Sequence, residues 1–304
     1  MFPILPANSA TAASGNQEGI FGYGNTATYT AVSNLVSNAG VVATDTTGVG
    51  TARMYVAACE YGGDKGIFGY GYTGSEVSMS NLVSNVGVVA TDVTGVGTDR
   101  RILAACSYGE DKGIFGYGTT GAPIFSMTNL VSNAGVVATD TTGVGTARRG
   151  LAACEYGGDK GIFGYGANSA GTLFSMTNLV SNAGVVATDV TGVGTARRLL
   201  AACSYGGDKG IFGYGTDDIG AGVQSVTNLV SNAGVAATDT TGVGTARYGL
   251  AATQYGGDKG IFGYGYGSGG DLSMTNLVSN AGVVATDVTG VGTARDFLAA
   301  CSFN

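Results

Sequence analysis

Short apolar segments separated by turn residues run along the whole chain. Between residues 200 and 238, four such segments follow one another, at 200–205, 211–214, 228–232 and 235–238. Glycine, asparagine and aspartate fill the connections, as expected for tight turns. Segments of this length, joined in this way, predict an up-and-down antiparallel sheet. No stretch combines a 3.6-residue apolar period with capping residues, so we expect almost no helix.

This four-segment unit occurs six times. The hexapeptide Gly-Ile-Phe-Gly-Tyr-Gly begins at residues 19, 66, 113, 161, 210 and 260, at intervals of 47 to 50 residues. The segments Asn-Leu-Val-Ser-Asn and Thr-Gly-Val-Gly-Thr recur at a similar spacing. A repeated unit of four antiparallel strands and ~40–50 residues is typical of a propeller blade. We therefore predict an all-β fold, a six-bladed β-propeller of four-stranded antiparallel blades.

The side chains of the repeat suit the wedge shape of a blade. The first strand, such as Leu200-Ala-Ala-Cys203, carries small residues that fit near a crowded central axis. In the second strand, Phe212 and Tyr214 are two positions apart and are expected on one face, with glycines on the other. We therefore expect the aromatic face of one blade to pack on the glycine face of the next.

The two ends of the chain complement each other. The first hexapeptide has no small-residue strand before it, and the last repeat ends with residues 298–303 and no hexapeptide after them. We predict that residues 298–304 and 19–45 together form the first blade, so that the C-terminal strand closes the ring. Closure would remove the exposed edge strands of an open array. The propeller domain is thus predicted at residues 18–304.

Composition supports a folded chain and narrows its partners. Glycine is abundant at 56 of 304 residues, proline is scarce at 3, and 44% of the residues are hydrophobic, which argues against a disordered polymer. The net charge of −7 disfavours nucleic acid and anionic membrane surfaces, which bind clustered Lys and Arg. No run approaches the ~20 apolar residues needed for membrane insertion. Residues 1–17 contain Pro3 and Pro6 and have no basic region, so we expect an extended tail rather than a signal peptide.

No catalytic or metal site can be assembled from the sequence. The chain has no histidine, the commonest general base and transition-metal ligand. Two matches to Gly-x-Gly-x-x-Gly, at 69–74 and 116–121, have no predicted helix after them to bind a nucleotide. One position holds a cysteine in five repeats and Thr253 in the sixth, and we expect small buried residues there rather than a metal-binding ring. The cysteines are Cys59, Cys106, Cys154, Cys203 and Cys301. We therefore predict no enzyme activity, no cofactor and no metal.

A repeated aspartate raises the alternative of calcium loops. Each repeat has one, at Asp45, Asp92, Asp140, Asp189, Asp239 and Asp287. No acidic residue lies two or four positions further on, so the ligand set of a calcium loop is incomplete. An arginine is also repeated, at Arg53, Arg100, Arg148, Arg197, Arg247 and Arg295. We expect the aspartates to pair with these arginines.

The repeat resembles the kelch repeat. Arg197 precedes the small-residue strand that begins at Leu200, and Gly213-Tyr-Gly215 stands where kelch units have paired glycines, although the usual tryptophan is absent. The nearly verbatim repeats are also similar to those of uncharacterised virion proteins of tailed phages. The second resemblance implies a virion structural protein, a tail-fibre, spike or head-decoration component, that is assembled in the host cytoplasm. A cellular, cytoplasmic kelch-type scaffold and a glycan-active enzyme with an unrecognised site are the alternatives.

Variation between the repeats is concentrated at two places that are expected on one face. The loop between the second and third strands varies, and so does the residue after the repeated arginine. Loops on a rigid scaffold commonly carry recognition. We therefore predict that this face binds a host-surface glycan or a neighbouring virion protein. The candidate residues are Tyr29, Tyr72, Glu76, Arg101, Phe125, Arg149, Asn168, Phe174, Arg198, Asp217, Asp218, Tyr248, Tyr266, Asp271 and Asp296.

A second pattern alternates between successive repeats. The residue after the cysteine position reads Glu60, Ser107, Glu155, Ser204, Gln254 and Ser302, and the residue after the repeated aspartate alternates between threonine and valine. The alternation indicates duplication of a two-blade unit. Docking onto a threefold or other symmetric assembly is its expected consequence.

Overall fold

The computed structural model describes residues 17–217 and 222–303. Throughout these residues the secondary structure consists of strands, bridges, turns and bends, which confirms the expected absence of helix. None of the described residues therefore belongs to a helix long and apolar enough to cross a membrane. Residues 1–16, which make up nearly all of the predicted tail, lie outside the described part.

The strands form a series of three-stranded antiparallel sheets, one for each repeat. In each sheet the strand of the hexapeptide lies in the middle, between a small-residue strand and an Asn-Leu-Val strand. The sheets are β20 (Ala299–Phe303), β1 (Glu18–Asn25) and β2 (Tyr29–Val36); β3 (Ala57–Tyr61), β4 (Lys65–Tyr72) and β5 (Glu76–Val83); β6 (Ala104–Tyr108), β7 (Lys112–Gly116) and β8 (Thr128–Val131); β9 (Ala152–Tyr156), β10 (Lys160–Gly164) and β11 (Thr177–Val180); β12 (Ala201–Tyr205), β13 (Lys209–Gly213) and β14 (Thr227–Val230); and β15 (Ala251–Tyr255), β16 (Lys259–Gly263) and β19 (Thr275–Val278). A two-stranded ribbon, β17 (Tyr266–Gly267) and β18 (Gly270–Asp271), follows β16.

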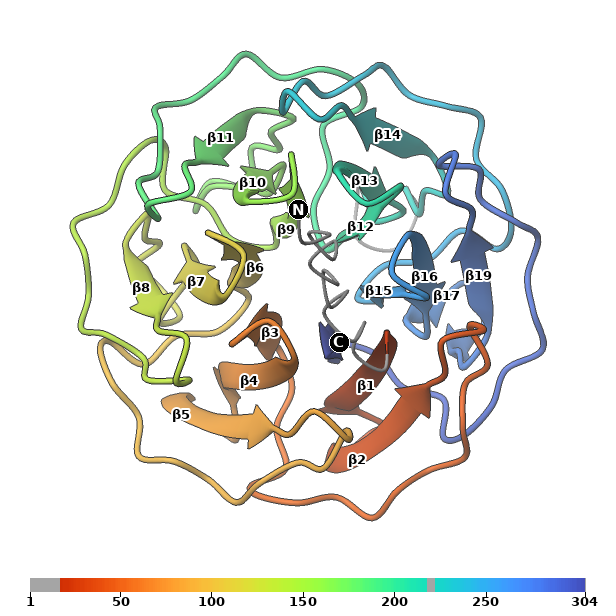
Figure 1. The fold of residues 1–304 in the computed structure, drawn as a ribbon. Coiled ribbons are helices and arrows are strands. Elements are labelled where there is room, and N and C mark those ends of the chain that lie inside the picture. The colour runs from red at the N-terminus through yellow and green to blue at the C-terminus, as the bar shows by residue number, and fades with distance from the viewer. Residues whose placement is uncertain (1–16, 218–221, 304) are drawn as a thin grey trace, which may run out of the picture.

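The sheets are arranged around a common axis in a propeller-like fold (Figure 1). The small-residue strands lie innermost, and each contacts the small-residue strand of the neighbouring sheet. The last strand, β20, pairs with the first, β1, in a register that places Phe303 opposite Glu18 and Ala299 opposite Gly22. The pairing expected between the C-terminal segment and the first repeat is therefore present.

The predicted fourth strand of each blade is reduced to isolated bridges. In the first repeat these bridges join Val36 to Val42 and Ser33 to Thr46. Between them, Nδ2 of Asn34 donates to the carbonyl oxygen of Ala43 at 3.0 Å and to Asp45 at 2.9 Å. In a regular antiparallel ladder, a backbone N–H would donate to the carbonyl oxygen of Ala43. Here the side chain of Asn34 donates to it instead. The ladder is interrupted, so the sheets have three strands and not four.

The expectation that the phenylalanine and tyrosine of the hexapeptide share a face is wrong. Phe68 points back at the preceding sheet, where its ring lies over Gly22, whereas Tyr70 points forward and packs against Phe115. The tyrosines have left-handed φ angles of 62° to 68°, and at β1 and β4 the register shifts at this position. A bulge with a left-handed residue rotates the side chain to the other face of the sheet.

The predicted packing of aromatic rings on glycines is confirmed. A Cβ atom at Gly22 would lie 2.7 Å from Cζ of Phe68, so only glycine leaves room for this ring. Between the sheets that contain β1 and β4, a buried cluster includes Ile20, Phe68 and Phe303. Equivalent clusters fill the other gaps between sheets. The hydrophobic core therefore lies between the sheets as separate wedges.

The cysteines belong to these wedges, as expected for small buried residues. All five are free and buried. Cys59 is 4% exposed, and burial raises the pKa of its thiol to about 12. Among the residues that the structure describes, no group of three or more His, Cys, Asp or Glu side chains is placed to hold a metal ion.

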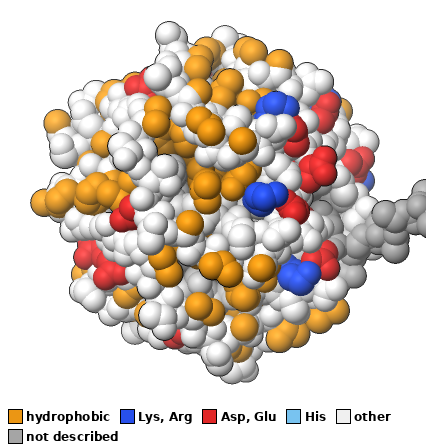
Figure 2. Space-filling view, turned by 60° about the vertical axis from the view of Figure 1, so that its left-hand side comes forward, with side chains coloured by type: hydrophobic (Ala, Val, Ile, Leu, Met, Phe, Trp, Pro, Cys, Tyr) orange, Lys and Arg blue, Asp and Glu red, His pale blue; other side chains and the backbone are white. Residues whose placement is uncertain are grey.

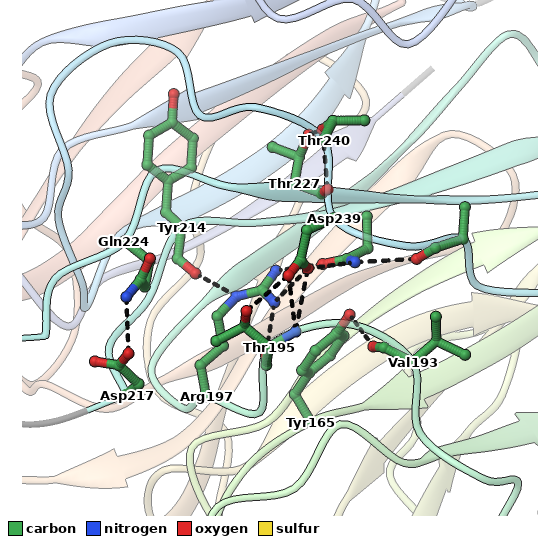
Figure 3. A network of polar contacts seen from close by, with 12 residues as sticks. Tyr165, Val193, Thr195, Arg197, Tyr214, Asp217, Gln224, Thr227, Asp239 and Thr240 are labelled. Carbon is green, nitrogen blue, oxygen red and sulfur yellow. Dashed lines mark hydrogen bonds and ion pairs between the residues drawn. The ribbon is translucent and has the colours of Figure 1, made fainter.

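Each repeated arginine is buried between two sheets in a polar network. Arg197 donates from Nε to the carbonyl oxygen of Tyr214 at 2.7 Å and from a terminal nitrogen to Oδ1 of Asn228 at 2.8 Å (Figure 3). Its guanidinium lies 4.4 Å from the ring centroid of Tyr165 in the preceding sheet and 3.9 Å from Oδ1 of Asp239. Asp239 also accepts two hydrogen bonds from Thr195, which lies in the connection that enters this sheet. Four of the six aspartates, Asp92, Asp189, Asp239 and Asp287, therefore lie within 4.0 Å of a repeated arginine, as predicted for them. The aspartates also fasten the connections between neighbouring sheets.

The outer rim carries a row of exposed valines from the segment after the Asn-Ala-Gly turn. Val41, Val88, Val136, Val185, Val235 and Val283 are 63–65% exposed. Figure 2 shows hydrophobic side chains gathered over this rim, and neighbouring acidic and basic side chains along the right-hand part of the view.

Candidate functional site

The variable and the invariant connections lie at opposite ends of the axis. Met54 pairs with Tyr72 and Arg149 pairs with Ala167, so the variable loops lie beside the residues that follow the repeated arginines. The Gly-Gly-Asp-Lys turns associate with one another instead, since Gly62 N donates to the carbonyl oxygen of Asp111 at 2.7 Å. The prediction of one varied and one uniform face is confirmed.

A cycle of backbone hydrogen bonds surrounds the axis at the varied end. Its members are the second residues after the repeated arginines, and each donates its N–H to the carbonyl oxygen of the member before it. In order, the donors are Tyr55 to Phe297 at 2.9 Å, Ile102 to Tyr55 at 3.4 Å, Gly150 to Ile102 at 3.0 Å, Leu199 to Gly150 at 2.7 Å, Gly249 to Leu199 at 2.9 Å and Phe297 to Gly249 at 2.7 Å. The cycle fixes the geometry of the end of the axis.

Every member of this cycle has a left-handed backbone. The φ angles of Tyr55, Ile102, Leu199 and Phe297 are 59°, 57°, 54° and 51°. This conformation is costly for residues other than glycine, and most of all for a β-branched residue such as Ile102. Such strain is commonly found at functional sites. Here it holds four large side chains around the axis.

A cavity of ≈ 360 Å³ opens at this end, and we call it the axial mouth. It is lined by Tyr55, Arg101, Ile102, Arg149, Gly150, Arg198, Leu199, Tyr248 and Phe297. Beyond it, a narrower space along the axis is lined mainly by the alanines of the inner strands. Four of the predicted site residues, Arg101, Arg149, Arg198 and Tyr248, therefore come together from four different repeats.

One side of the axial mouth is basic. Arg101, Arg149 and Arg198 are contributed by three consecutive repeats, and all three are half-buried. Nε of Arg101 lies 3.2 Å from Oε1 of Glu76, and its guanidinium lies 4.4 Å from the ring centroid of Tyr72. Glu76 and Tyr72, which were also predicted as site residues, thus hold Arg101 at the axial mouth.

The other side of the axial mouth is aromatic. The ring centroids of Tyr55 and Phe297 are 4.3 Å apart, and those of Tyr248 and Phe297 are 6.1 Å apart. Tyr266 extends this surface outward, 5.5 Å from Tyr248. Tyr29, which lies 6.0 Å from Tyr72, extends the surface that carries Arg101.

A buried carboxylate accompanies the aromatic side. Asp296 is 4% exposed, and Nδ2 of Asn25 donates to its Oδ1 at 3.1 Å. Burial raises the pKa of Asp296 to about 7, and the negative charge of Asp271 adds to the effect. Burial also raises the pKa of Asp271, whose Oδ1 has no hydrogen-bond partner among the described residues. The surroundings of Asp296 thus favour its protonated form more than water does.

The remaining predicted residues lie elsewhere on the varied face. Phe125 and Phe174 are half-buried and do not line the axial mouth. Oδ1 of Asn168 accepts from Thr172 N at 2.9 Å and so closes its own loop. Asp217 accepts from Gln224 at 2.8 Å on an exposed loop, and Asp218 lies outside the described residues.

Four lining residues that are not glycine were not predicted as site residues. They are Tyr55, Ile102, Leu199 and Phe297. A signal for them exists in the sequence, since the second residue after the repeated arginine varies as strongly as the first. At one of the two glycines in this series a larger residue would clash, because a Cβ atom at Gly249 would lie 2.8 Å from Cε1 of Phe297.

The opposite end of the axis carries the alternating residues. Glu60, Glu155 and Gln254 line a small axial space there, with a serine between each pair. Oγ of Ser302 donates to Oε2 of Glu60 at 2.8 Å. Burial, together with repulsion from Glu60 and neighbouring acids, raises the pKa of Glu155 to about 8.

Glu155→Gln is expected to stabilise the protein above pH 8 and to leave its stability unchanged near pH 4. The carboxyl of Glu155 has a pKa of about 8 when folded, against 4.5 as an ordinary value, so its ionisation increasingly opposes folding as the pH rises between these values. We expect a gain of about 1–3 kcal/mol at pH 9, since one pKa unit corresponds to about 1.4 kcal/mol and the side chain is only half-buried. Urea unfolding at both pH values measures this gain. Gln254→Glu should have the opposite effect, and an equal response of wild type and Glu155→Gln to pH would contradict the prediction.

Comparison with known proteins finds neither a family model nor a curated protein that matches this chain. The kelch-type and phage resemblances therefore stay predictions.

Proposed function

We propose that the chain is a closed six-bladed β-propeller. The pairing of β20 with β1, the contact of each inner strand with the next, and the cycle of hydrogen bonds from Tyr55 to Phe297 support this proposal. A further support is Arg295, which donates to the carbonyl oxygen of Tyr23 and packs on Tyr264, and so joins the last repeat to the first.

We further propose that this propeller is a non-enzymatic virion structural protein that binds a host-surface glycan through its varied face. The observation that carries the binding function is the convergence of varied residues. Four of the six residues that follow the repeated arginines line one cavity, on a scaffold whose opposite face hardly changes between repeats. Varied positions at one mouth of a rigid scaffold are typical of ligand recognition. Assignment to a virion is supported by the resemblance of the repeats alone.

The test of binding is a glycan array and a host-cell binding assay with the full chain. We expect selective binding that is lost when the loops at 72–77 and 216–224 are replaced by the loop at 25–30 of the first repeat. Lys209→Gln, in a turn of the uniform face, is the matched control and should bind like the wild type. Absence of binding to every glycan and to host cells, or binding to a purified protein alone, would contradict the glycan-recognition proposal.

The virion assignment has its own test. The protein should be present in purified, nuclease-treated particles, and a particle reconstruction should place it at a threefold or other symmetric position if the two-blade alternation reflects docking. Absence from the particles would favour a cellular scaffold. A position without symmetry would contradict only the docking proposal.

A further inference from the structure

We propose that the axial mouth binds a sugar that carries a carboxylate, with the carboxylate held on the side formed by Arg101, Arg149 and Arg198. This inference rests on the proposed function and names the ligand class of its site.

The three arginines come from consecutive repeats and line the same cavity. They follow Arg100, Arg148 and Arg197, whose burial between the sheets fixes where the next residue emerges. A guanidinium recognises a carboxylate through two parallel N–H donors, and half-buried arginines do so in a less polar medium than water. Arg149, with Arg101 and Arg198 contributed by the repeats on either side, therefore offers paired donors to the two oxygens of a carboxylate.

The charges around the mouth orient such a ligand. Glu76 is paired with Arg101, and Arg149 has no acidic partner among the described residues. The cycle of hydrogen bonds places the repeat of Arg149 opposite that of Asp296. The charge of Arg149 is therefore available to attract an anion to this side of the mouth.

The aromatic side and the size of the mouth favour a single sugar. Tyr55, Tyr248 and Phe297 offer ring surfaces to the C–H groups of a sugar, and the tyrosines add hydroxyl groups. The cavity of ≈ 360 Å³ lies at the small end of ligand sites, which suits one terminal residue. The overall charge of −7 would repel an anionic polymer such as nucleic acid, which argues against such a ligand.

The experiment uses the methyl glycosides of N-acetylneuraminic acid and of glucuronic acid as probes. The methyl esters of both acids and methyl glucoside are the neutral counterparts, and galactose 6-sulfate is the alternative anion. Binding to the full chain is measured by titration calorimetry and by saturation-transfer NMR. We expect at least one free acid to bind about 10-fold or more tightly than its ester and than the sulfated sugar.

Variants of Arg149 locate the binding. This position holds Met54, Tyr248 and Asp296 in other repeats, so it tolerates different side chains. Arg149→Gln should weaken binding by about 10- to 100-fold, and Arg149→Lys by less, since it keeps the charge but loses the paired donors. Lys209→Gln removes the same charge from the opposite face and should bind normally. Thermal unfolding of each variant checks that it is folded.

Any one of the following results would overturn the inference. They are equal binding of acid and ester, unchanged binding by folded Arg149→Gln, and no detectable binding of either acid at about 20 mM. Preference for the sulfated sugar would likewise exclude the carboxylate. If the glycan array reports a neutral glycan whose binding depends on the loops, the proposed recognition function stands and only this inference fails.

Discussion

Deletion of residues 298–304 is expected to abolish cooperative unfolding of the whole domain and to make the protein aggregate. The deletion removes β20, whose Phe303 is fully buried and whose Ala299 and Cys301 are 6% and 4% exposed. Truncation of one buried phenylalanine to alanine alone typically costs about 3–5 kcal/mol, so loss of the strand should exceed about 5 kcal/mol. The deletion also leaves β1 with an unpaired edge, which invites pairing with other chains. Urea unfolding followed by circular dichroism, together with light scattering, measures both effects.

The repeat itself provides the control for this deletion. In β12 and β13, residues 205–210 join the small-residue strand to the hexapeptide through the turn Gly-Gly-Asp-Lys. A permuted chain, in which residues 298–303 are followed by Gly-Gly-Asp-Lys and then by 19–297, should therefore unfold like the wild type. A truncated protein that remains monomeric, with an unchanged urea midpoint, would contradict the closed ring. Failure of the permuted chain to fold would contradict the equivalence of the first blade with the others.

The sequence allowed the repeated architecture to be predicted because the same local signals occur in every copy. Turn residues at fixed offsets define the strands, and an incomplete first and last repeat indicates that the two ends pair. These local signals could not predict that the side chains of Tyr70 and Phe68 point to opposite faces of the sheet. It depends on a left-handed φ of 62° at a residue that is not glycine, which the surrounding packing imposes.

The reduction of the fourth strand was equally hidden in the sequence. Asn34 appears there as one polar residue of a strand, and its role becomes visible only when its amide is seen to take the carbonyl of Ala43. Polar side chains that replace backbone donors are a tertiary feature. Strand propensity and alternation contain no information about them.

The candidate site was predicted in part. Variation after the repeated arginine identified Arg101, Arg149, Arg198 and Tyr248, which line the axial mouth. Variation in the loops also selected Phe125 and Phe174, which do not. Sequence variation identifies a face of the molecule, whereas the direction of each side chain depends on backbone angles. The left-handed residues Tyr55 and Phe297 point to the axis for that reason.

Arg197→Met is expected to destabilise the protein by about 3–5 kcal/mol, the cost typical of removing one partner from a buried charged network. Methionine has a similar length and fills much of the space. It leaves Oδ1 of Asn228 and the carbonyl oxygen of Tyr214 without the donors that Arg197 provides at 2.8 and 2.7 Å. The change also removes the cation that lies over the ring of Tyr165, and it leaves Asp239 without its positive neighbour (Figure 3).

The pH dependence of this loss separates the network from simple packing. Burial raises the pKa of Asp239, but hydrogen bonds from Thr195 and Asn228 and the positive charge of Arg197 lower it by more. The pKa of Asp239 therefore lies below its ordinary value of 3.8. A lowered carboxyl pKa stabilises the fold above the unfolded-state pKa, and the stabilisation is lost as the pH falls through the folded-state pKa. The difference in the free energy of unfolding between wild type and Arg197→Met should therefore become smaller in strong acid.

Two further variants complete the comparison. Arg197→Lys retains the charge but not the geometry of the donors, and it should fall between wild type and Arg197→Met. Lys209→Met also replaces a basic residue by methionine, but in a turn at the surface. It should change the free energy of unfolding by less than about 0.5 kcal/mol. A loss below about 1 kcal/mol for Arg197→Met would show that these arginines are spacers between sheets rather than the polar links that hold them together.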